Sequence, residues 1–431
     1  MDGTVVMKFG GTSVADAERL KRAAARMVRA REDGLSVVGV LSARGKTTDE
    51  LIAMAEEVSP APDPREMDML LSTGERISCA LCAMAINDLG HRAISLTGSQ
   101  AGIVTDTSHT KARILDVRAD RIREALSKEQ IVLVAGFQGV STAKDVTTLG
   151  RGGSDTTAVA LAAAVGAEVC EIYTDVSGVF TADPRVVPDA RKLPVVSFEE
   201  MLEMAASGAG VLQLRSVEYA RNHGVRIHCR SSFSDEPGTF VVGEEETMEH
   251  PLITAVTHST DEARVTLLGV PDTPGVAGRI FTALADHNVN VDMIIQNEPA
   301  SEGAEADMSF TVPRSDLRAA NLALAPVIAE YGIRSQDDPE MGKVSIVGAG
   351  MRSHPGVAAR VFSTLGERGI NIEMISTSPI KISCVVRADR LPDAVRALHQ
   401  AFELGEEDVR PEHPFGKAQA KPVTSEARPR A

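Results

Sequence analysis

The first 240 or so residues alternate short apolar runs, rich in β-branched side chains, with longer stretches of helical periodicity. Residues 16–31 and 156–165 have the periodicity of helices. Strands are predicted from the runs VVMKF, LSVVGVLS, HRAISL, IVLVAGF, VCEIYTDV and VRIHCR. This alternation predicts a three-layer α/β sandwich with a largely parallel central sheet. Ligands of such a sheet bind at the carboxyl ends of its strands.

A glycine- and glutamate-rich stretch, GTFVVGEEETMEHP, interrupts the alternation at residues 238–251 and is typical of a linker. A shorter stretch with three prolines, SPAPDPR at 59–65, predicts an exposed loop inside the first domain. The polar residues at the end of the chain are expected to be disordered. We therefore divide the chain into a first domain at 1–240, a linker with the first regulatory strand at 241–260, two modules at 261–338 and 339–412, and a tail at 413–431.

Beyond the linker the chain repeats itself with a period of about 80 residues. RVTLLGV, starting at Arg264, matches KVSIVGA, starting at Lys343, and each copy continues with a Pro-Gly-Val loop, a helix and the pattern Asn-apolar-Asp/Glu-Met. A third strand and a closing helix complete a ferredoxin-like α+β module. A Pro-Gly loop can simply start a helix, but its bared N–H groups also suit a small carboxylate. Because the loop recurs beside polar strand residues, we favour a ligand loop.

Charge and composition narrow the class of protein. The chain has 60 acidic and 45 basic residues, a net charge of −15, which disfavours a nucleic-acid partner. The uncharged apolar run 158–167 is about half of the ~20 residues that span a bilayer, so we expect no membrane span. No hydrophobic leader precedes the first strand, which favours the cytoplasm. Five cysteines fit reduced core thiols, and Cys79-x-x-Cys82 lacks the second pair that a zinc site needs.

Two glycine-rich turns follow predicted strands and open helices. In the first, Lys8-Phe9-Gly10-Gly11-Thr12-Ser13, the glycines let the backbone approach phosphate oxygens and the lysine adds a positive charge. In the second, residues 150–157 (GRGGSDTT), the arginine suits a carboxylate or phosphate, and Ser154 is placed to cap the helix. Neither turn has the spacing of a Walker A loop or of GxGxxG. The sequence therefore predicts phosphate handling by another architecture.

Three further segments carry polar residues near strand ends. Residues 42–49 (SARGKTTD) offer hydroxyl groups, and residues 74–76 (GER) offer one carboxylate beside an apolar helix. Each is, taken alone, more typical of a helix cap than of a site. Residues 173–176 (YTDV) lead to FTADPR at 180–185, where Asp and Thr side chains can contact a ribose or base. An ordinary Asx turn is the alternative there.

Together these segments resemble the aspartate kinases of the amino-acid-kinase family. The order KFGGTSV, SARGKTTDEL, GER, TTLGRGGSDTTA and YTDVSGVFTADPR, followed by two repeats of the kind called ACT, covers residues 5–402. The resemblance implies phosphorylation of the L-aspartate side-chain carboxylate by ATP to give 4-phospho-L-aspartate, the first step toward lysine, threonine and methionine. At 431 residues, we expect no fusion to a homoserine dehydrogenase.

The resemblance also assigns roles to individual residues. The catalytic set would be Lys8, which stabilises the transferring phosphoryl group, Asp155, which positions Lys8, and Arg151. The aspartate set would be Ser42, Thr47, Glu75, Arg151, Gly152, Gly153 and Ser154, with Glu75 facing the ammonium and Arg151 the α-carboxylate. The nucleotide set would be Lys8, Gly10, Gly11, Ser13, Thr174, Asp175, Phe180, Asp183 and Arg185. Mg²⁺ would arrive with ATP, held mostly by phosphate oxygens, with no dedicated protein ligands.

One position departs from the family pattern. Before VLQLRSVEYA the family usually has a lysine that helps to bind the nucleotide, whereas this chain has Gly210. Arg215 is a candidate to compensate for that missing charge. Arg44, where a methionine is common, is a lesser difference beside the substrate loop.

In the regulatory part the resemblance is to aspartate kinases of actinobacterial type, which lysine, threonine or both inhibit at paired ACT repeats. Asp292 and Glu373 would face an effector ammonium. A homodimer through the repeats is implied, or an α2β2 assembly with a short subunit started at Met248. The effector positions would be Asp272, Pro274, Gly275, Val276, Asn290, Asp292 and Gln296 in the first copy, and Met351, His354, Gly356, Val357, Asn371, Glu373 and Ser376 in the second.

Two other functions were weighed. A kinase for glutamate or its N-acetyl derivative is disfavoured by GRGGSDTTA with SARGKTTDEL and by the paired repeats. A catalytically impaired subunit that only senses amino acids is suggested by Gly210, but Lys8, Glu75, Arg151 and Asp155 are all present.

Overall fold

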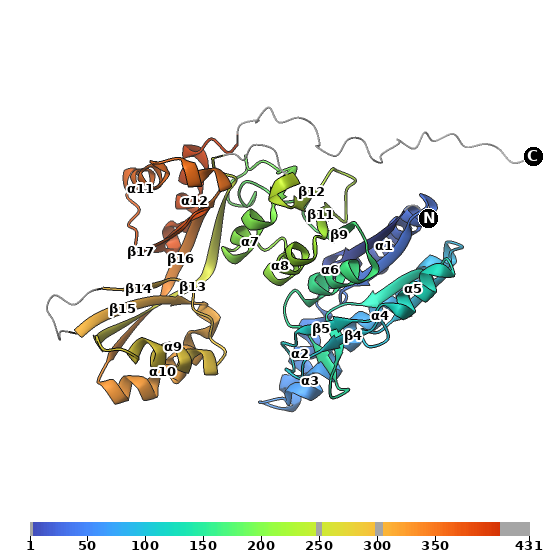
Figure 1. Cartoon of the computed structure of the whole chain (residues 1–431), viewed down its shortest axis with the longest axis horizontal. Coiled ribbons are helices and arrows are strands. Elements are labelled where there is room, and N and C mark those ends of the chain that lie inside the picture. Colours follow the sequence, from blue (N-terminus) through green and yellow to red (C-terminus); the bar gives the residue numbers. More distant parts are fainter. Residues whose placement is uncertain (1–2, 247–251, 298–304, 406–431) are drawn as a thin grey trace, which may run out of the picture.

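The catalytic half of the chain is built on one twisted, mostly parallel sheet (Figure 1). The computed structural model describes residues 3–246, 252–297 and 305–405. The sheet has the strand order β10-β12-β11-β9-β1-β2-β6-β3, and only β11 and β12 pair antiparallel. Its strands are β1 (Thr4–Phe9), β2 (Ser36–Leu41), β3 (Ala93–Leu96), β6 (Ile131–Ala135), β9 (Val169–Thr174), β10 (Val195–Ser197), β11 (Arg226–Ser231) and β12 (Thr239–Val242).

Helices cover both faces of this sheet, which confirms the predicted three-layer sandwich. A smaller sheet lies beside it, with the order β5-β4-β7-β8. The helices are α1 (Ala17–Glu32), α2 (Thr47–Val58), α3 (Pro64–Leu71), α4 (Thr73–Asp88), α5 (Asp120–Ser127), α6 (Gly153–Val165), α7 (Phe198–Ala206) and α8 (Leu214–His223). The small sheet comprises β4 (Ile103–Thr105), β5 (Ile114–Val117), β7 (Gln138–Ser141) and β8 (Val146–Thr148).

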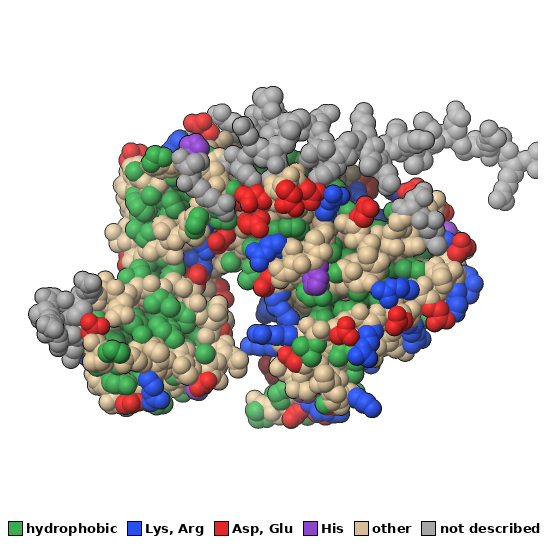
Figure 2. Space-filling view, in the orientation of Figure 1, with side chains coloured by type: hydrophobic (Ala, Val, Ile, Leu, Met, Phe, Trp, Pro, Cys, Tyr) green, Lys and Arg blue, Asp and Glu red, His purple; other side chains and the backbone are tan. Residues whose placement is uncertain are grey.

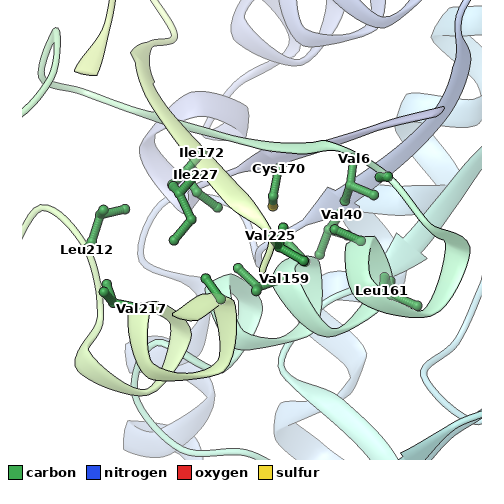
Figure 3. Packing of buried hydrophobic residues seen from close by; sticks show 14 of the residues in the cluster. Val6, Val40, Val159, Leu161, Cys170, Ile172, Leu212, Val217, Val225 and Ile227 are labelled. Atoms are coloured by element: carbon green, nitrogen blue, oxygen red, sulfur yellow. The ribbon is translucent and has the colours of Figure 1, made fainter. Parts of the chain in front are cut away.

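The period of two along β1 divides the core into two clusters. Met7 and Phe9 pack under α1 and α4, whereas Val6 packs on the other face, under α6 and α8. Figure 3 shows the second cluster, where Val159 of α6 lies among strand residues such as Cys170. Helix α6 is buried along its first ten residues because it is the central helix of this layer.

The apolar α3–α4 segment meets by length and composition the test for a membrane span, over residues 64–88. Half of its most apolar window is buried inside the fold, and Cys79, Cys82 and Ile86 pack in the core under the sheet. A core helix of a soluble domain passes the same test, so we read this segment as part of the sandwich. All five cysteines are free and buried, as predicted for reduced core thiols.

The regulatory half has a single sheet of six strands, ordered β14-β15-β13-β16-β18-β17. Its two long strands, β13 (Ala255–Pro271) and β16 (Arg334–Val347), each give one half to each repeat. Residues 255–259 pair with 343–347 in the second repeat, and residues 264–268 pair with 334–338 in the first. The other elements are α9 (Val276–Asp286), β14 (Ile294–Gln296), β15 (Glu305–Val312), α10 (Leu317–Tyr331), α11 (Val357–Glu367), β17 (Met374–Ser378), β18 (Lys381–Arg387) and α12 (Leu391–Ala401).

The start of the proposed linker belongs to the catalytic sheet. Residues 239–242 form β12, which pairs with β10 and β11, because the β-branched TFVV segment fits a strand despite the glycine before it. The proposed divisions at 260 and 338 fall inside β13 and β16. Residues 247–251, with Met248, and the tail at 413–431 lie outside the described residues.

The second repeat packs directly on the catalytic domain. Ala182 and Val187, from the loop between β9 and β10, share one apolar cluster with α11, α12 and β16. Thr181 of the same loop lies within hydrogen-bond distance of His399 of α12 (Oγ1 to Nε2, 3.0 Å) and accepts the Val256 N–H through its carbonyl (2.7 Å). The segment that the sequence assigns to the nucleotide is therefore also the segment that contacts the second repeat.

Candidate active site

A buried ion pair joins the two glycine-rich turns. Lys8 is the penultimate residue of β1, and its Nζ lies 2.5 Å from Asp155 Oδ1 in the first turn of α6. Both side chains are nearly buried, with 12% and 8% of their surfaces exposed. Asp155 thus fixes the lysine where β1 ends and α6 begins, the place at which such a sheet binds anions.

The first glycine turn lies against the turn after β2. A Cβ on Gly11 would lie 2.8 Å from the Ala43 carbonyl oxygen, so only glycine allows this approach. Gly10 donates its N–H to the Tyr173 carbonyl at the end of β9 (3.3 Å). Ser13 is buried, with its Oγ 2.6 Å from Ser232 Oγ after β11. The carboxyl ends of four neighbouring strands therefore meet at Lys8.

Glu75 is a buried carboxylate with one oxygen unused. It lies in the first turn of α4, where Gly74 packs against Ala43 and Thr47. Glu75 Oε1 accepts the Ala43 N–H (3.1 Å), and Oε2 has no hydrogen-bond partner in the described part of the chain. Burial raises the pKa of Glu75 to about 7, against the smaller lowering effect of backbone N–H groups. The Oε2 atom of Glu75 therefore suits contact with a cation.

The GRGG turn differs in one detail from the sequence prediction. Gly152, with φ +71°, is the residue before α6, and the helix begins at Gly153 without a side-chain cap. Ser154 is inside the helix, so the prediction that it caps the helix is wrong: the left-handed glycine occupies the cap position, and its missing Cβ would meet Gln213 at 2.0 Å. Arg151 is exposed, and its guanidinium has no protein partner within the described ranges. Ser42 follows β2, where its N–H binds the Phe9 carbonyl (3.1 Å).

The proposed nucleotide residues follow β9. Thr174 bonds to Asp175 (Oγ1 to Oδ1, 3.1 Å), and Phe180 pairs with Lys192 across the loop. Asp183 and Arg185 form an ion pair of 2.7 Å that lowers the pKa of Asp183.

The position at which the family usually has a lysine is exposed to solvent in this chain. Gly210 is exposed, and a Cβ there would meet nothing within 4 Å. Arg215 does not replace the lysine as an unattached cation: its guanidinium donates to the carbonyls of Leu149 (2.7 Å) and Ala112 (3.1 Å). Arg44 donates to the carbonyls of Val14 and Ala15, away from a substrate role.

The proposed effector residues lie at two equivalent places in the repeats. Gly275 and Gly356 both have φ +99° and precede α9 and α11. Val276 and Val357 are the first residues of these helices. The other proposed residues lie in the loops before them and on or just before β14 and β17: Asp272, Pro274, Asn290, Asp292, Gln296, Met351, His354, Asn371, Glu373 and Ser376.

The two carboxylates expected to face an effector ammonium are already paired. Lys343, at which the repeated sequence pattern starts in the second copy, binds Asp292 of the first repeat (2.5 Å). Arg264, the matching residue of the first copy, binds Glu373 of the second repeat (2.9 Å). Lys343 also binds the buried Glu262 at 2.8 Å. An effector ammonium would have to compete with these cations.

Sequence reasoning missed a buried network under the substrate side of the site. Asp68 of α3 is fully buried and lies 2.7 Å from His109 Nδ1; it accepts bonds from the Thr110 N–H (3.1 Å) and the Thr148 hydroxyl (2.6 Å). It ties the segment before β5 to β8, which leads into GRGG. In the sequence, PREMDMLL resembles any amphipathic helix, so nothing marked this aspartate.

Known proteins match this arrangement over almost the whole chain. The model of the amino acid kinase family matches residues 3–231, and that of the ACT domain matches 265–326 and 344–402. The aspartokinase of Mycolicibacterium smegmatis is 57% identical over 408 residues, covering 94% of this chain and 97% of that protein.

Two crystal structures of Escherichia coli aspartokinase III, both 26% identical, have the same fold. The complex with aspartate and ADP (R-state) has a TM-score of 0.79 and covers 92% of this chain and 99% of the other. The complex with lysine and aspartate (T-state) has a TM-score of 0.70, with 93% and 99% covered. These matches confirm the fold and family predicted from the sequence: the chain belongs to the amino acid kinase family, as an aspartate kinase of the actinobacterial type with ACT domains.

Proposed function

We propose that this aspartate kinase transfers the γ-phosphoryl group of ATP to the side-chain carboxylate of L-aspartate at the site between Lys8 and Glu75. The observation that carries the proposal is the pairing of two built charges at adjoining strand ends. A buried lysine, fixed by Asp155, suits a phosphoryl group, and a buried glutamate with an unused oxygen suits an amino-acid ammonium.

In this reaction the substrate supplies the nucleophile. A side-chain oxygen of aspartate forms a bond to the γ-phosphorus, the bond from that phosphorus to the β–γ bridging oxygen breaks, and ADP leaves with the electron pair. Phosphoryl transfer needs positioning and charge stabilisation more than covalent chemistry. Lys8 supplies the charge, and Arg151, which has no protein partner among the described residues, is assigned to the α-carboxylate.

The nucleotide is assigned to the glycine turn at Gly10 and Gly11 and to the loop after β9. Mg²⁺ fits this site only as a companion of the phosphates, because the described residues contain no cluster of three or more His, Cys, Asp or Glu side chains that could hold a metal. When bound, it would neutralise charge on the phosphate oxygens. Lys8, held in place by Asp155, would orient those oxygens from the protein side.

Regulation is assigned to the ACT repeats, with lysine, threonine or both as inhibitors. The lysine-bound E. coli relative and the glycine loops at Gly275 and Gly356 support this assignment. An effector shifts the enzyme only if it binds one arrangement of the repeats better than another. We further propose a homodimer through the repeats or an α2β2 assembly, a cytoplasmic location, and a product that leads to lysine, threonine and methionine. A subunit that only senses amino acids is not favoured.

The substrate assignment predicts a pH-dependent affinity. Only ionised Glu75 attracts the ammonium, and its pKa of about 7 means that it becomes neutral as the pH falls. The KM for aspartate should therefore rise about tenfold per pH unit below 7. In Glu75→Gln, KM should be raised at least about tenfold at pH 8 and be flat with pH.

The matched control is Glu50→Gln, which changes an exposed glutamate of α2. It should keep the wild-type pH profile. A wild-type KM that stays constant from pH 6 to 8, or a Glu75→Gln enzyme with normal KM for aspartate, would remove Glu75 from substrate recognition.

A further inference from the structure

A second polar cavity lies outside the catalytic site, between the start of β5, α6 and α8. Its volume is about 530 Å³. Lys111 and Arg113 line it from the segment before β5, Arg215 and Tyr219 from α8, and Thr156 from α6. Figure 2 shows Lys and Arg side chains gathered on this side of the catalytic domain, facing the first ACT repeat. The proposed roles of the catalytic residues leave this cavity unexplained.

The lining of the cavity has more cationic than acidic side chains. Lys111, Arg113 and Arg215 form no ion pair with any residue in the described ranges. Glu218 is the one acidic lining residue, so the lining carries a surplus of two positive charges. Burial lowers the pKa of Arg215 and the charge of Arg113 lowers it further, whereas Asp106 and Glu218 act in the opposite direction. An anion in the cavity would relieve this repulsion.

Backbone carbonyl groups hold the Arg215 side chain in place. Arg215 is half-buried and donates from both terminal nitrogens, to the Leu149 carbonyl and to the Ala112 carbonyl. Ala112 lies between the two other cations and is itself buried, with its N–H bonded to the Thr148 carbonyl (2.9 Å). Asp68 binds both Thr148 and the N–H of Thr110, one residue before Lys111. The guanidinium fork is therefore fixed before any ligand arrives.

We propose that this cavity binds the phosphate group of a small metabolite. Three cations line one wall of the cavity, and the side chains of Thr156, Tyr219 and Asn222 can form hydrogen bonds beside them. This combination suits a group with several charged oxygens. The volume leaves room for an organic part beside the phosphate. Occupancy changes aspartate binding, because Arg215 holds the carbonyl of Leu149, two residues before Arg151. This last consequence rests on the proposed role of Arg151, whereas binding itself does not.

The test is direct binding by isothermal titration calorimetry to the full chain. The probes are inorganic phosphate and glycerol 3-phosphate, with succinate as a dianion that lacks phosphate. In the double variant Lys111→Gln/Arg113→Gln, phosphate affinity should fall at least tenfold. Both side chains are exposed, so the fold should persist, which unfolding curves would verify. Arg221→Gln, an exposed arginine of α8 that does not line the cavity, is the matched control and should bind as the wild type does.

A second variant separates this cavity from the catalytic site. Lys8→Met removes the catalytic cation, and it should leave phosphate binding at the cavity intact even if activity is lost. Tighter binding of glycerol 3-phosphate than of inorganic phosphate would assign the site to an organic phosphate, and the reverse would assign it to the free ion. Binding lost in Lys8→Met but kept in the double variant, equal binding of succinate, or no saturable binding would overturn the proposal.

Discussion

The two ACT repeats have the same order of elements but different surroundings. The second repeat shares an apolar cluster with Ala182 and Val187 of the loop after β9 and bonds to it through His399. The main apolar cluster of the first repeat contains residues 263–333 alone, and a small cluster of Met293 with Met341, Met374 and Val385 joins it to the second repeat. Among the described residues, no hydrogen bond or ion pair joins residues 261–338 to the catalytic domain. In Figure 1 it lies at the end of the regulatory sheet away from α7.

The difference assigns separate tasks to two copies of one module. A change in the second repeat reaches the loop after β9, the nucleotide loop of our proposal, directly through packed side chains. A change in the first repeat must pass through what the repeats share. These shared parts are β13, β16, the small methionine cluster around Met293 and the crossed ion pairs of Lys343 and Arg264. Packed interfaces move between discrete arrangements more readily than they deform, so these shared elements are where the repeats can influence each other.

The crossed ion pairs of Lys343 and Arg264 lie at equivalent positions of the two repeats but differ in burial. Removing each cation should therefore lower the unfolding free energy by different amounts. Lys343 is 5% exposed and lies between Glu262 and Asp292, so Lys343→Met leaves a buried carboxylate unpaired and should cost about 3–5 kcal/mol of unfolding free energy. Arg264 is 26% exposed, and Arg264→Met should cost about 1 kcal/mol. Urea denaturation at pH 7.5 measures both. Equal losses of unfolding free energy would mean that the two ion pairs stabilise the fold equally.

Substitution of one buried leucine in α10 and one in α12 separates an effect on stability from an effect on the loop after β9. Leu324 and Leu398 are both buried, and changing either to alanine should cost about 2–5 kcal/mol. Only Leu398 shares a cluster with the nucleotide loop, so Leu398→Ala should also raise the KM for ATP, by about tenfold, through misplacement of that loop. Unfolding curves and initial rates at varied ATP give the two values. A similar rise in Leu324→Ala would contradict the separation of tasks.

The histidine contact adds a pH dependence that the first repeat lacks. Burial lowers the pKa of His399, and Arg191 adds to this while Asp189 opposes it. The folded state favours the neutral ring, so stability is complete above the ordinary pKa near 6.5 and is lost as the pH falls below it. Between pH 7.5 and 5.5 the wild type should lose about 1 kcal/mol more than His399→Gln. His287→Gln, an exposed histidine of the first repeat, should follow the wild type.

The sequence predicted the elements and the repeats well, because each rests on local periodicity. The glycine turns of the site could also be predicted from local sequence. Gly11 and Gly152 mark close backbone approaches that no other residue allows. Strand and side-chain pairs that meet only in the tertiary fold could not be predicted from the sequence. The exchange of strand halves between repeats depends on pairing across about 80 residues.

Buried acids give no local signal. Glu200 of α7 follows a capping serine, as in any helix, yet it also accepts bonds from Thr254 (2.6 Å) and the Ala349 N–H (3.1 Å) of the regulatory part. Asp68 likewise looks like a surface residue of a short helix. Periodicity reports which face of a helix is apolar, but not which acid on that helix the tertiary fold will cover.

The most direct test of the catalytic assignment is ADP release with Mg-ATP and aspartate, with hydroxylamine present to trap the acyl phosphate as a hydroxamate. Lys8→Ala is compared with Lys21→Ala, an exposed lysine of α1, and glutamate serves as the control substrate. We predict aspartate-dependent hydroxamate in the wild type and Lys21→Ala, and a loss of about 10²–10³ in kcat for Lys8→Ala. Turnover with aspartate no greater than with glutamate, or a Lys8→Ala enzyme as active as the wild type, would contradict the account.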